Sequence, residues 1–243
     1  MIVNSRGIVF QQLKYGETSL IIKIFTEELG VRSYMVKGVR SKKARLKPSL
    51  FEPLTLLDLQ VYNKPNQNLQ HIKEARVAYA WQHITFSIEK QSVLMFLDEV
   101  LYKTIREESA NKPLFQWIFH QLHWFDLEEK KFMNFHLYFL IQLTRFLGFY
   151  PKVEFFESSD GIIFNMQDGQ LGHQVPGHPY YVEKETAQNF LRLLQSSLDT
   201  LKQLKISNQQ RRQLLDVLLI YFRLHLPEMG KIQSLDVLRV IMA

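Results

Sequence analysis

The densest group of charged side chains in the sequence lies between Lys37 and Lys47. Six of these eleven residues are lysine or arginine, and no aspartate or glutamate occurs between Gly30 and Phe51. Lysine and arginine side chains in a loop bind phosphate oxygens without reading a base sequence. A loop that is merely solvated is the alternative, but six cations without a compensating anion repel one another, so we favour contact with phosphate.

Aromatic side chains in the same part of the sequence could add stacking on bases. They are Phe10, Tyr15, Phe25, Tyr34 and Tyr62. Alternate positions of a strand point inward, so only some of these rings can reach a ligand. The residues that we expect to contact nucleic acid are Lys14, Tyr15, Arg32, Lys37, Arg40, Lys42, Lys43, Arg45 and Lys47.

Residues that could form a catalytic or metal centre are sparse. The sequence has no cysteine, which excludes disulfides, thiolate zinc sites and cysteine nucleophiles. It lacks the glycine spacing of nucleotide-binding loops and the Gly-x-Ser-x-Gly motif of hydrolases. His120 and His123 lie on a helical stretch, and His173 and His178 flank a turn, but no carboxylate completes a metal site at either place. We therefore expect no enzyme activity, no cofactor and no bound metal.

The positive charge of the 243-residue chain is confined to its first third. Residues 1–80 hold 13 Lys and Arg against 6 Asp and Glu, a net charge of +7, whereas residues 81–243 have a net charge of −1. Such an asymmetry indicates contact with nucleic acid or with a membrane surface. No apolar run approaches the 18 residues of a membrane span, and no secretion signal is visible. A soluble, cytoplasmic protein is expected.

The first 80 residues have the pattern of short β-strands separated by turns. Runs rich in β-branched and aromatic residues alternate with turn signals at residues 15–17, 29–30 and 63–66. We predict strands over residues 7–10, 19–25, 33–36 and 54–62, with a weaker one over 69–75. About five short strands in such a segment indicate a small closed barrel or sandwich.

From Trp81 onward the apolar residues recur with helical spacing. We predict a helix over about 25 residues from there, then one that begins at residues 111–113. A third should be capped by Asp126 and end near Gly148. After a turn-rich stretch over residues 151–179, helices should follow over 183–194, after Ser207 and after Ser234. The chain is therefore expected to be an α+β protein, with a strand-rich domain over residues 1–80 and a helical domain over 81–243.

Three N-terminal segments resemble the bacterial DNA repair protein RecO family. They are Tyr-Gly-Glu-Thr-Ser-Leu-Ile-Ile at residues 15–22, Phe-Thr-Glu-Glu-Leu-Gly at 25–30 and Val-Lys-Gly-Val-Arg at 36–40. Leu-Phe-Glu-Pro-Leu at residues 50–54 and Phe-Leu-Gly-Phe-Tyr-Pro at 146–151 are also similar to family motifs. The resemblance implies an N-terminal OB-fold followed by an α-helical domain.

The resemblance also implies a role without catalysis in the RecF pathway of recombinational repair. RecO-like proteins bind single- and double-stranded DNA, anneal complementary strands and help to load recombinase. The implied partners are RecR and the acidic C-terminal tail of single-stranded DNA-binding protein. Many members carry a four-cysteine zinc site where this chain has residues 153–179 without cysteine. We therefore expect that segment to be held by packing of Phe155, Phe156, Ile162, Ile163 and Phe164.

An acidic tail with an apolar end would bind a hydrophobic pocket that is rimmed by Lys or Arg. The candidates in the helical part are Lys130, Lys131, Arg145, Arg211, Arg212 and Arg223. Ordinary solvated helix faces are the alternative for each of them. Two other functions also stay open for the whole chain: a protein-interaction scaffold whose basic loop docks an acidic partner, and, less favoured, a hydrolase that acts on nucleic acid.

Overall fold

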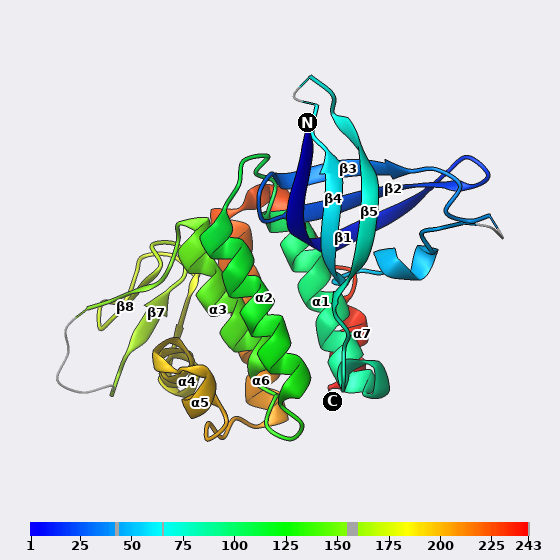
Figure 1. Ribbon diagram of the computed structural model, residues 1–243. Coiled ribbons are helices and arrows are strands. Elements are labelled where there is room, and N and C mark those ends of the chain that lie inside the picture. Colours follow the sequence, from blue (N-terminus) through cyan, green and yellow to red (C-terminus); the bar gives the residue numbers. More distant parts are fainter. Residues whose placement is uncertain (42–43, 65, 155–159, 243) are drawn as a thin grey trace. The chain divides into compact units, whose positions relative to one another are not determined.

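In the part of the chain that the structure describes, five strands close into a barrel over the first 79 residues (Figure 1). The strands are β1 (Ile2–Tyr15), β2 (Ser19–Thr26), β3 (Gly30–Val36), β4 (Leu56–Tyr62) and β5 (Leu69–Tyr79). Their order around the barrel is β1-β2-β3-β5-β4, and pairing of β4 with the first half of β1 closes it. The computed structural model describes residues 1–41, 44–64, 66–154 and 160–242.

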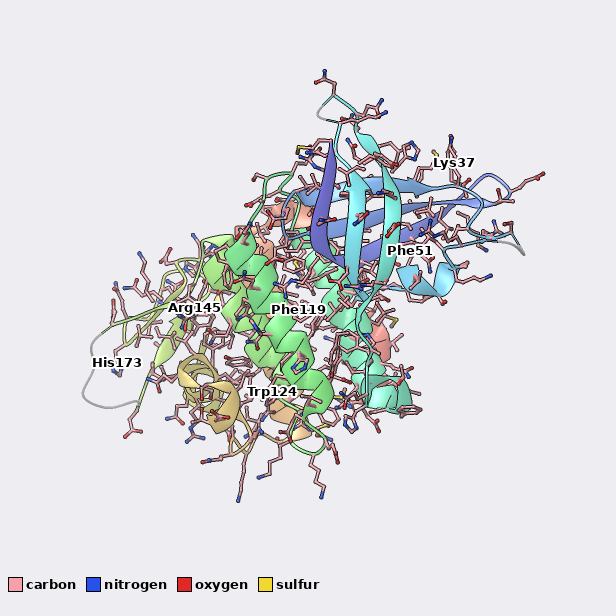
Figure 2. All side chains as sticks on the ribbon, in the orientation of Figure 1. Lys37, Phe51, Phe119, Trp124, Arg145 and His173 are labelled. Carbon is pink, nitrogen blue, oxygen red and sulfur yellow. The ribbon has the colours of Figure 1, made fainter. Side chains whose placement is uncertain are left out.

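Alternation of side chains along the strands builds the core of the barrel. Along β2, Leu20, Ile22 and Ile24 are buried, while the residues between them face outward. Tyr34 of β3 and Phe51 of the 3₁₀ helix η1 (Pro48–Phe51) pack in the same core. Phe51 is labelled in Figure 2. Each such buried side chain contributes roughly 1.5–3 kcal/mol relative to exposure. The predicted OB-like barrel followed by helices is therefore confirmed.

Strand β1 is much longer than residues 7–10, where the sequence predicts it. It spans Ile2–Tyr15 and pairs with β4 through its first half and with β2 through its second half. A register shift between Val9 and Gln11 marks a bulge, which lets one strand serve two partners around a closed barrel. Asn4 and Arg6 face outward in the first half of β1. These polar residues interrupt the apolar run, so the sequence pattern does not predict the strand there.

Two helices complete the first of two compact units, which are Met1–Leu127 and Glu128–Ala243. Helix α1 (Ile88–Thr104) follows the short 3₁₀ helix η2 (Ile84–Phe86) and is capped by Ser87, whose hydroxyl accepts a bond from the amide of Lys90. Helix α2 (Lys112–Leu127) begins where Asn111 and Pro113 predict. The barrel ends at the predicted domain boundary near residue 80. That boundary stays a prediction, because α1 and α2 belong to the same compact unit as the barrel.

The prediction that Asp126 caps a third helix is wrong. Asp126 is fully buried in the last turn of α2. Its carboxylate accepts hydrogen bonds from the Tyr79 hydroxyl and from the amides of Gln82, His83 and Ile84, at 2.7–2.9 Å. Burial alone would raise the pKa of Asp126, but these donors hold it below its usual value. The residue therefore fixes the link from β5 to α1.

The second unit contains helices and a small sheet. Helix α3 (Phe135–Leu147) begins nine residues after Asp126 and ends, as predicted, at Gly148, which is left-handed with φ 87°. The other helices are α4 (Lys184–Gln195), α5 (Leu198–Leu201), α6 (Asn208–His225) and α7 (Leu235–Ile241), with the 3₁₀ helix η3 (Pro227–Met229) before the last. The predicted capping box of Ser207 and Gln210 is present at the start of α6.

The turn-rich stretch after Gly148 forms a four-stranded sheet that the sequence does not predict. Its strands are β6 (Lys152–Val153), β7 (Ile163–Asn165), β8 (Gln170–Gly172) and β9 (Tyr181–Glu183), in the order β6-β8-β7-β9. Strands of two or three residues are too short to show a periodic pattern. Ile162, Ile163 and Phe164 are buried, as the packing hypothesis requires. Phe155 and Phe156 lie outside the described residues.

Candidate nucleic-acid interface

The basic loop that follows β3 is fastened to the turn between β1 and β2. The amide of Arg40 donates to the carbonyl oxygen of Thr18 at 3.1 Å. Gly38 is left-handed with φ 67°, and the amide of Ser41 donates to its carbonyl at 3.0 Å. The loop therefore turns back at once over the neighbouring hairpin. Lys42 and Lys43, which the sequence also predicts as contact residues, lie outside the described residues.

Strand register brings the predicted contact residues on β1 to the same end of the barrel. Lys14 pairs with Leu20, and Leu20 pairs with Val36, the last residue of β3. Lys14 and Lys37 thus lie at the same end of β1 and β3, the two strands on either side of β2, and Figure 2 shows Lys37 at this end. Tyr15, which is 53% exposed, is the next residue of β1. We call Lys14, Tyr15, Lys37 and Arg40, together with Lys47 at the far end of the same loop, the basic end of the barrel.

The cations at the basic end are available to a ligand. Lys14, Lys37, Arg40 and Lys47 are exposed, and within the described ranges none of these four side chains forms an ion pair. Cations without counter-charges attract an anionic polymer over distances up to the Debye length, about 10 Å at 0.1 M salt. Phosphate groups of a nucleic acid are therefore suitable partners for this end.

Two of the predicted contact residues are engaged elsewhere. Arg45 donates to Glu74 of β5 at 3.2 Å. Arg32 pairs with Glu108 at 2.9 Å and lies four residues before the end of β3, roughly 13 Å from the basic end at 3.3 Å per residue. The structure thus separates Arg32 from the loop residues with which the sequence grouped it. Its contact with nucleic acid stays a prediction.

Two further cations of the barrel lie outside the basic run of the sequence. Lys23 of β2 lies on the outer face of the barrel, 5.1 Å above the ring of Tyr102 from α1. Lys73 of β5 is exposed. Lys23 and Lys73 both lie outside the run of basic residues between Lys37 and Lys47. Only the alternation of inward and outward side chains along each strand could have predicted that they face outward.

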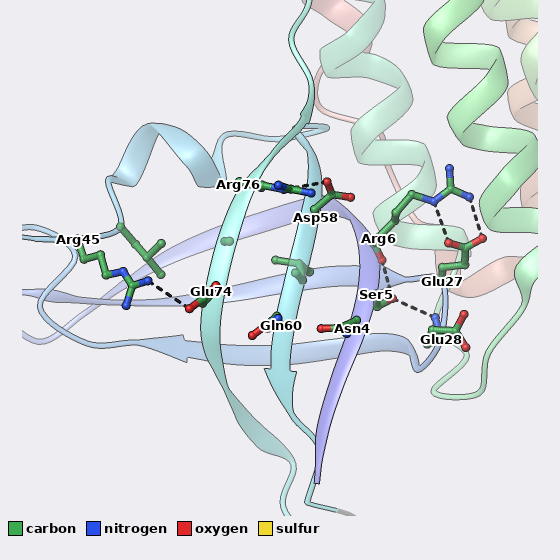
Figure 3. A pocket seen from close by; sticks show the side chains of 13 residues that line it. Asn4, Ser5, Arg6, Glu27, Glu28, Arg45, Asp58, Gln60, Glu74 and Arg76 are labelled. Atoms are coloured by element: carbon green, nitrogen blue, oxygen red, sulfur yellow. Dashed lines mark hydrogen bonds and ion pairs between the residues drawn. The ribbon is translucent and has the colours of Figure 1, made fainter.

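The outer faces of β1, β4 and β5 form a hollow of about 660 Å³ with a different character (Figure 3). Three ion pairs line it, Arg6 with Glu27 at 2.8 Å, Arg76 with Asp58 at 3.1 Å and Arg45 with Glu74. These carboxylates would repel phosphate, so the hollow is not part of the proposed interface.

The pair of Arg6 and Glu27 instead joins the barrel to α2. The hydrogen bond from Arg6 lowers the pKa of Glu27, and the guanidinium lies 4.8 Å from the ring centre of Phe119. Gln116 of α2 donates to the same carboxylate at 3.0 Å. The contacts of this pair are therefore structural.

The candidate partner residues of the helical unit do not form one site. Lys131 and Arg211 line a hollow of about 470 Å³ with Leu204 and Ile206. Arg223 lines a separate groove of about 530 Å³ between α6, η3 and α7. Arg145 lies over the ring of Tyr150, 4.0 Å from its centre, and Arg212 and Lys130 are exposed.

The histidines form no metal site in the part of the chain that the structure describes. Among the described residues, no group of three or more His, Asp or Glu is placed to hold a metal ion. The ring of His123 lies 4.6 Å from that of Tyr79, and His178 accepts a hydrogen bond from the amide of Tyr180 at 3.2 Å. No helix in the described ranges is long and apolar enough to cross a membrane.

Known proteins match almost the whole chain. The family model for the recombination protein O N terminal matches residues 1–81, and that for the recombination protein O C terminal matches residues 85–235. The DNA repair protein RecO of Phocaeicola vulgatus is 36% identical over 239 residues, which is 98% of each chain. That of Bacteroides fragilis is 37% identical over 240 residues, also 98% of each. That of Christiangramia forsetii is 34% identical over 242 residues, or 99% of each. The chain therefore belongs to the recombination protein O (RecO) family.

Proposed function

We propose that this protein binds single- and double-stranded DNA at the basic end of its barrel, anneals complementary strands and helps to load recombinase. Membership of the RecO family supports a role in DNA repair and recombination. The observation that carries the binding proposal is the bond from Arg40 to Thr18. It fastens the basic loop to the turn between β1 and β2, next to cations that form no ion pair among the described residues.

Annealing by such a surface requires no active site. Two complementary strands repel each other through their phosphates, and cations bound to both lower that repulsion and raise the local concentration of the strands. Family members are named as DNA repair proteins and not as enzymes. We propose a mediator that is not an enzyme and acts in the cytoplasm.

A strand-annealing assay tests the proposed function. The double variant Lys37→Ala with Arg40→Ala should slow the annealing of complementary oligonucleotides at least about tenfold, since each loss of ~1.4 kcal/mol in binding is a factor of ten. The control, Lys152→Ala with Arg212→Ala, removes the same charges from exposed positions of the second unit and should leave the rate unchanged. Equal rates for both double variants would contradict the proposal.

We propose further that the groove between α6, η3 and α7 receives the acidic tail of single-stranded DNA-binding protein. Leu219, Ile232 and Leu235 line it with apolar groups, and Arg223 and Lys231 line it with cations. Its carboxylates are Asp216, which is paired with Arg239, and Asp236. Such a groove suits a peptide with acidic residues and an apolar end, because carboxylates and side chain find separate partners. RecR is a second proposed partner, for which no surface is assigned.

Substitution of Arg223 tests the tail site. Arg223→Ala should weaken the binding of a synthetic acidic peptide with an apolar C-terminal residue about tenfold, because a charge-assisted contact is worth roughly 1.5–3 kcal/mol. Arg212→Ala removes the same charge from α6 outside the groove and should bind the peptide like the parent. The measurement is a peptide titration at constant ionic strength. A loss with Arg212→Ala and none with Arg223→Ala would contradict this site.

A further inference from the structure

The hollow of about 470 Å³ beside the start of α6 is lined by cations and by no carboxylate among the described residues. Its charged lining residues are Lys131, Lys202, Lys205 and Arg211. Glu128, which is outside the lining, pairs with Lys202 at 2.6 Å and neutralises that cation. Within the described ranges, the side chains of Lys131, Lys205 and Arg211 form no ion pair. Three uncompensated positive charges therefore line one hollow.

Two oxygen atoms hold the guanidinium of Arg211 beside this hollow. It donates to the carbonyl oxygen of Ile206 at 2.6 Å and to the side-chain oxygen of Asn208. Burial lowers the pKa of Arg211. Burial, together with the nearby charge of Arg211, also lowers the pKa of His136 to about 3. The charge of Arg211 thus acts on a buried neighbour, and a half-buried cation of this kind is costly unless an anion accompanies it.

The helix that carries Arg211 also favours an anion at this place. Arg211 is the fourth residue of α6, close to the N-terminal end, where the helix dipole disfavours a cation. The first turn of α6 holds no acidic residue, and its cap Ser207 lines the same hollow. An arginine at the unfavourable end of a helix is a local conflict, which is typical of a binding site.

Apolar side chains form the rest of the hollow. Met133, Leu201, Leu204 and Ile206 line it, and Met133 and Leu204 are half-buried. The side-chain amide of Asn134 donates to the carbonyl oxygen of Leu204 at 2.8 Å, which ties the segment before α6 to the start of α3. This segment is therefore held in place without a ligand. The volume lies within the range of roughly 300–1,000 Å³ that is usual for small-molecule sites.

We propose that this hollow binds a free nucleoside diphosphate, with its phosphates at the cations and its base against the apolar side chains. A phosphate monoester carries about 1.5–2 negative charges and three acceptor oxygens, so two adjacent phosphates match three uncompensated cations. The forked guanidinium of Arg211 suits two oxygens of one phosphate, while Lys131 and Lys205 supply point charges. The carboxylates of an acidic peptide are spread along a backbone of about 3.3 Å per residue, which gives a lower density of charge. The site shares no residue with the basic end of the barrel or with the groove at Arg223.

Calorimetric titration of the full chain with ADP tests this site. We expect ADP to bind at least about tenfold more tightly than adenosine or inorganic pyrophosphate, because each of these lacks one part of the ligand. Equal affinities for ADP and pyrophosphate, or no binding of ADP, would overturn the proposal. An oligonucleotide with a 5′-phosphate should not displace ADP. Displacement that requires the 5′-phosphate would overturn the proposal and assign the hollow to a DNA end.

Paired variants locate the ligand within the second unit. Lys131→Ala with Lys205→Ala removes two exposed cations of the hollow and should weaken the binding of ADP at least about tenfold, and Arg211→Gln should do the same. The control, Lys130→Ala with Lys152→Ala, removes the same charges from exposed positions outside the hollow and should bind ADP like the parent. Equal losses in the two double variants would overturn the site. Unchanged binding of ADP together with a loss of acidic-peptide binding in Lys131→Ala with Lys205→Ala would also overturn it and indicate a protein partner.

Discussion

Single side chains in this protein carry out tasks that their neighbours in sequence do not reveal. Asp126 holds the segment from Tyr79 to Ile84, more than forty residues earlier in the chain. Arg45 belongs to the basic run, yet it is paired with Glu74. The residue type and the local sequence indicate a different role in each case. They predict an N-cap for Asp126 and a phosphate contact for Arg45. The observed partners of both residues are far away in the sequence. Local sequence patterns carry no information about such tertiary contacts.

Asp126→Asn should lower the free energy of unfolding by about 2 kcal/mol at neutral pH, because the amide accepts fewer of the four bonds and loses their charge assistance. The folded-state pKa of Asp126 is below its ordinary value, so its contribution is complete above about pH 4 and is lost as the pH falls through the folded-state pKa. The difference between parent and variant in urea unfolding should therefore shrink towards pH 2. A difference that grows on acidification, or one matched by the exposed Asp199→Asn, would contradict this role.

At the scale of elements, the sequence predicts the kind of structure better than its extent. Strand β2, helix α2 and the cap of α6 lie where alternation, Pro113 and Ser207 place them, whereas β3 begins at Gly30, three residues before the predicted start. The extent of β1 depends on pairing with two partners, and the short sheet after Gly148 has no periodicity of its own. Both are decided by tertiary contacts that override local propensity.

Gly30 fixes the start of β3 against the link between α1 and α2. It is left-handed with φ 70°, and a Cβ there would lie 2.4 Å from the carbonyl oxygen of Ser109. Gly38 has a similar φ of 67° but open space around it. Gly38→Ala should therefore cost only the conformational strain of about 1–2 kcal/mol, and Gly30→Ala clearly more. Thermal unfolding of the two variants distinguishes backbone strain, which both share, from the steric clash, which only Gly30→Ala has. Equal losses of stability in the two variants would contradict the tight contact at Gly30.

At the scale of the whole molecule, the barrel has two surfaces of different charge. One is the basic end, and the other is the hollow on β1, β4 and β5, which is lined by ion pairs. The excess of cations in the first third is exposed at the basic end, while the ion pairs of Arg6 and Arg76 keep the hollow on β1, β4 and β5 nearly balanced. The cationic loop could be predicted from the positions of lysine and arginine along the sequence. The separation of Arg32 and the groove at Arg223 could not, because each depends on strand register or helix packing.

The dependence of DNA binding on salt tests the central claim, that the basic end of the barrel holds phosphate groups. If about five phosphates are contacted, log K plotted against log salt should have a slope of about −4 to −5 for the parent protein. Replacing Lys14, Lys37, Arg40 and Lys47 by alanine should reduce the steepness by about 3 to 4, since each cation accounts for about one. A slope that stays at the parent value in this variant would contradict the account.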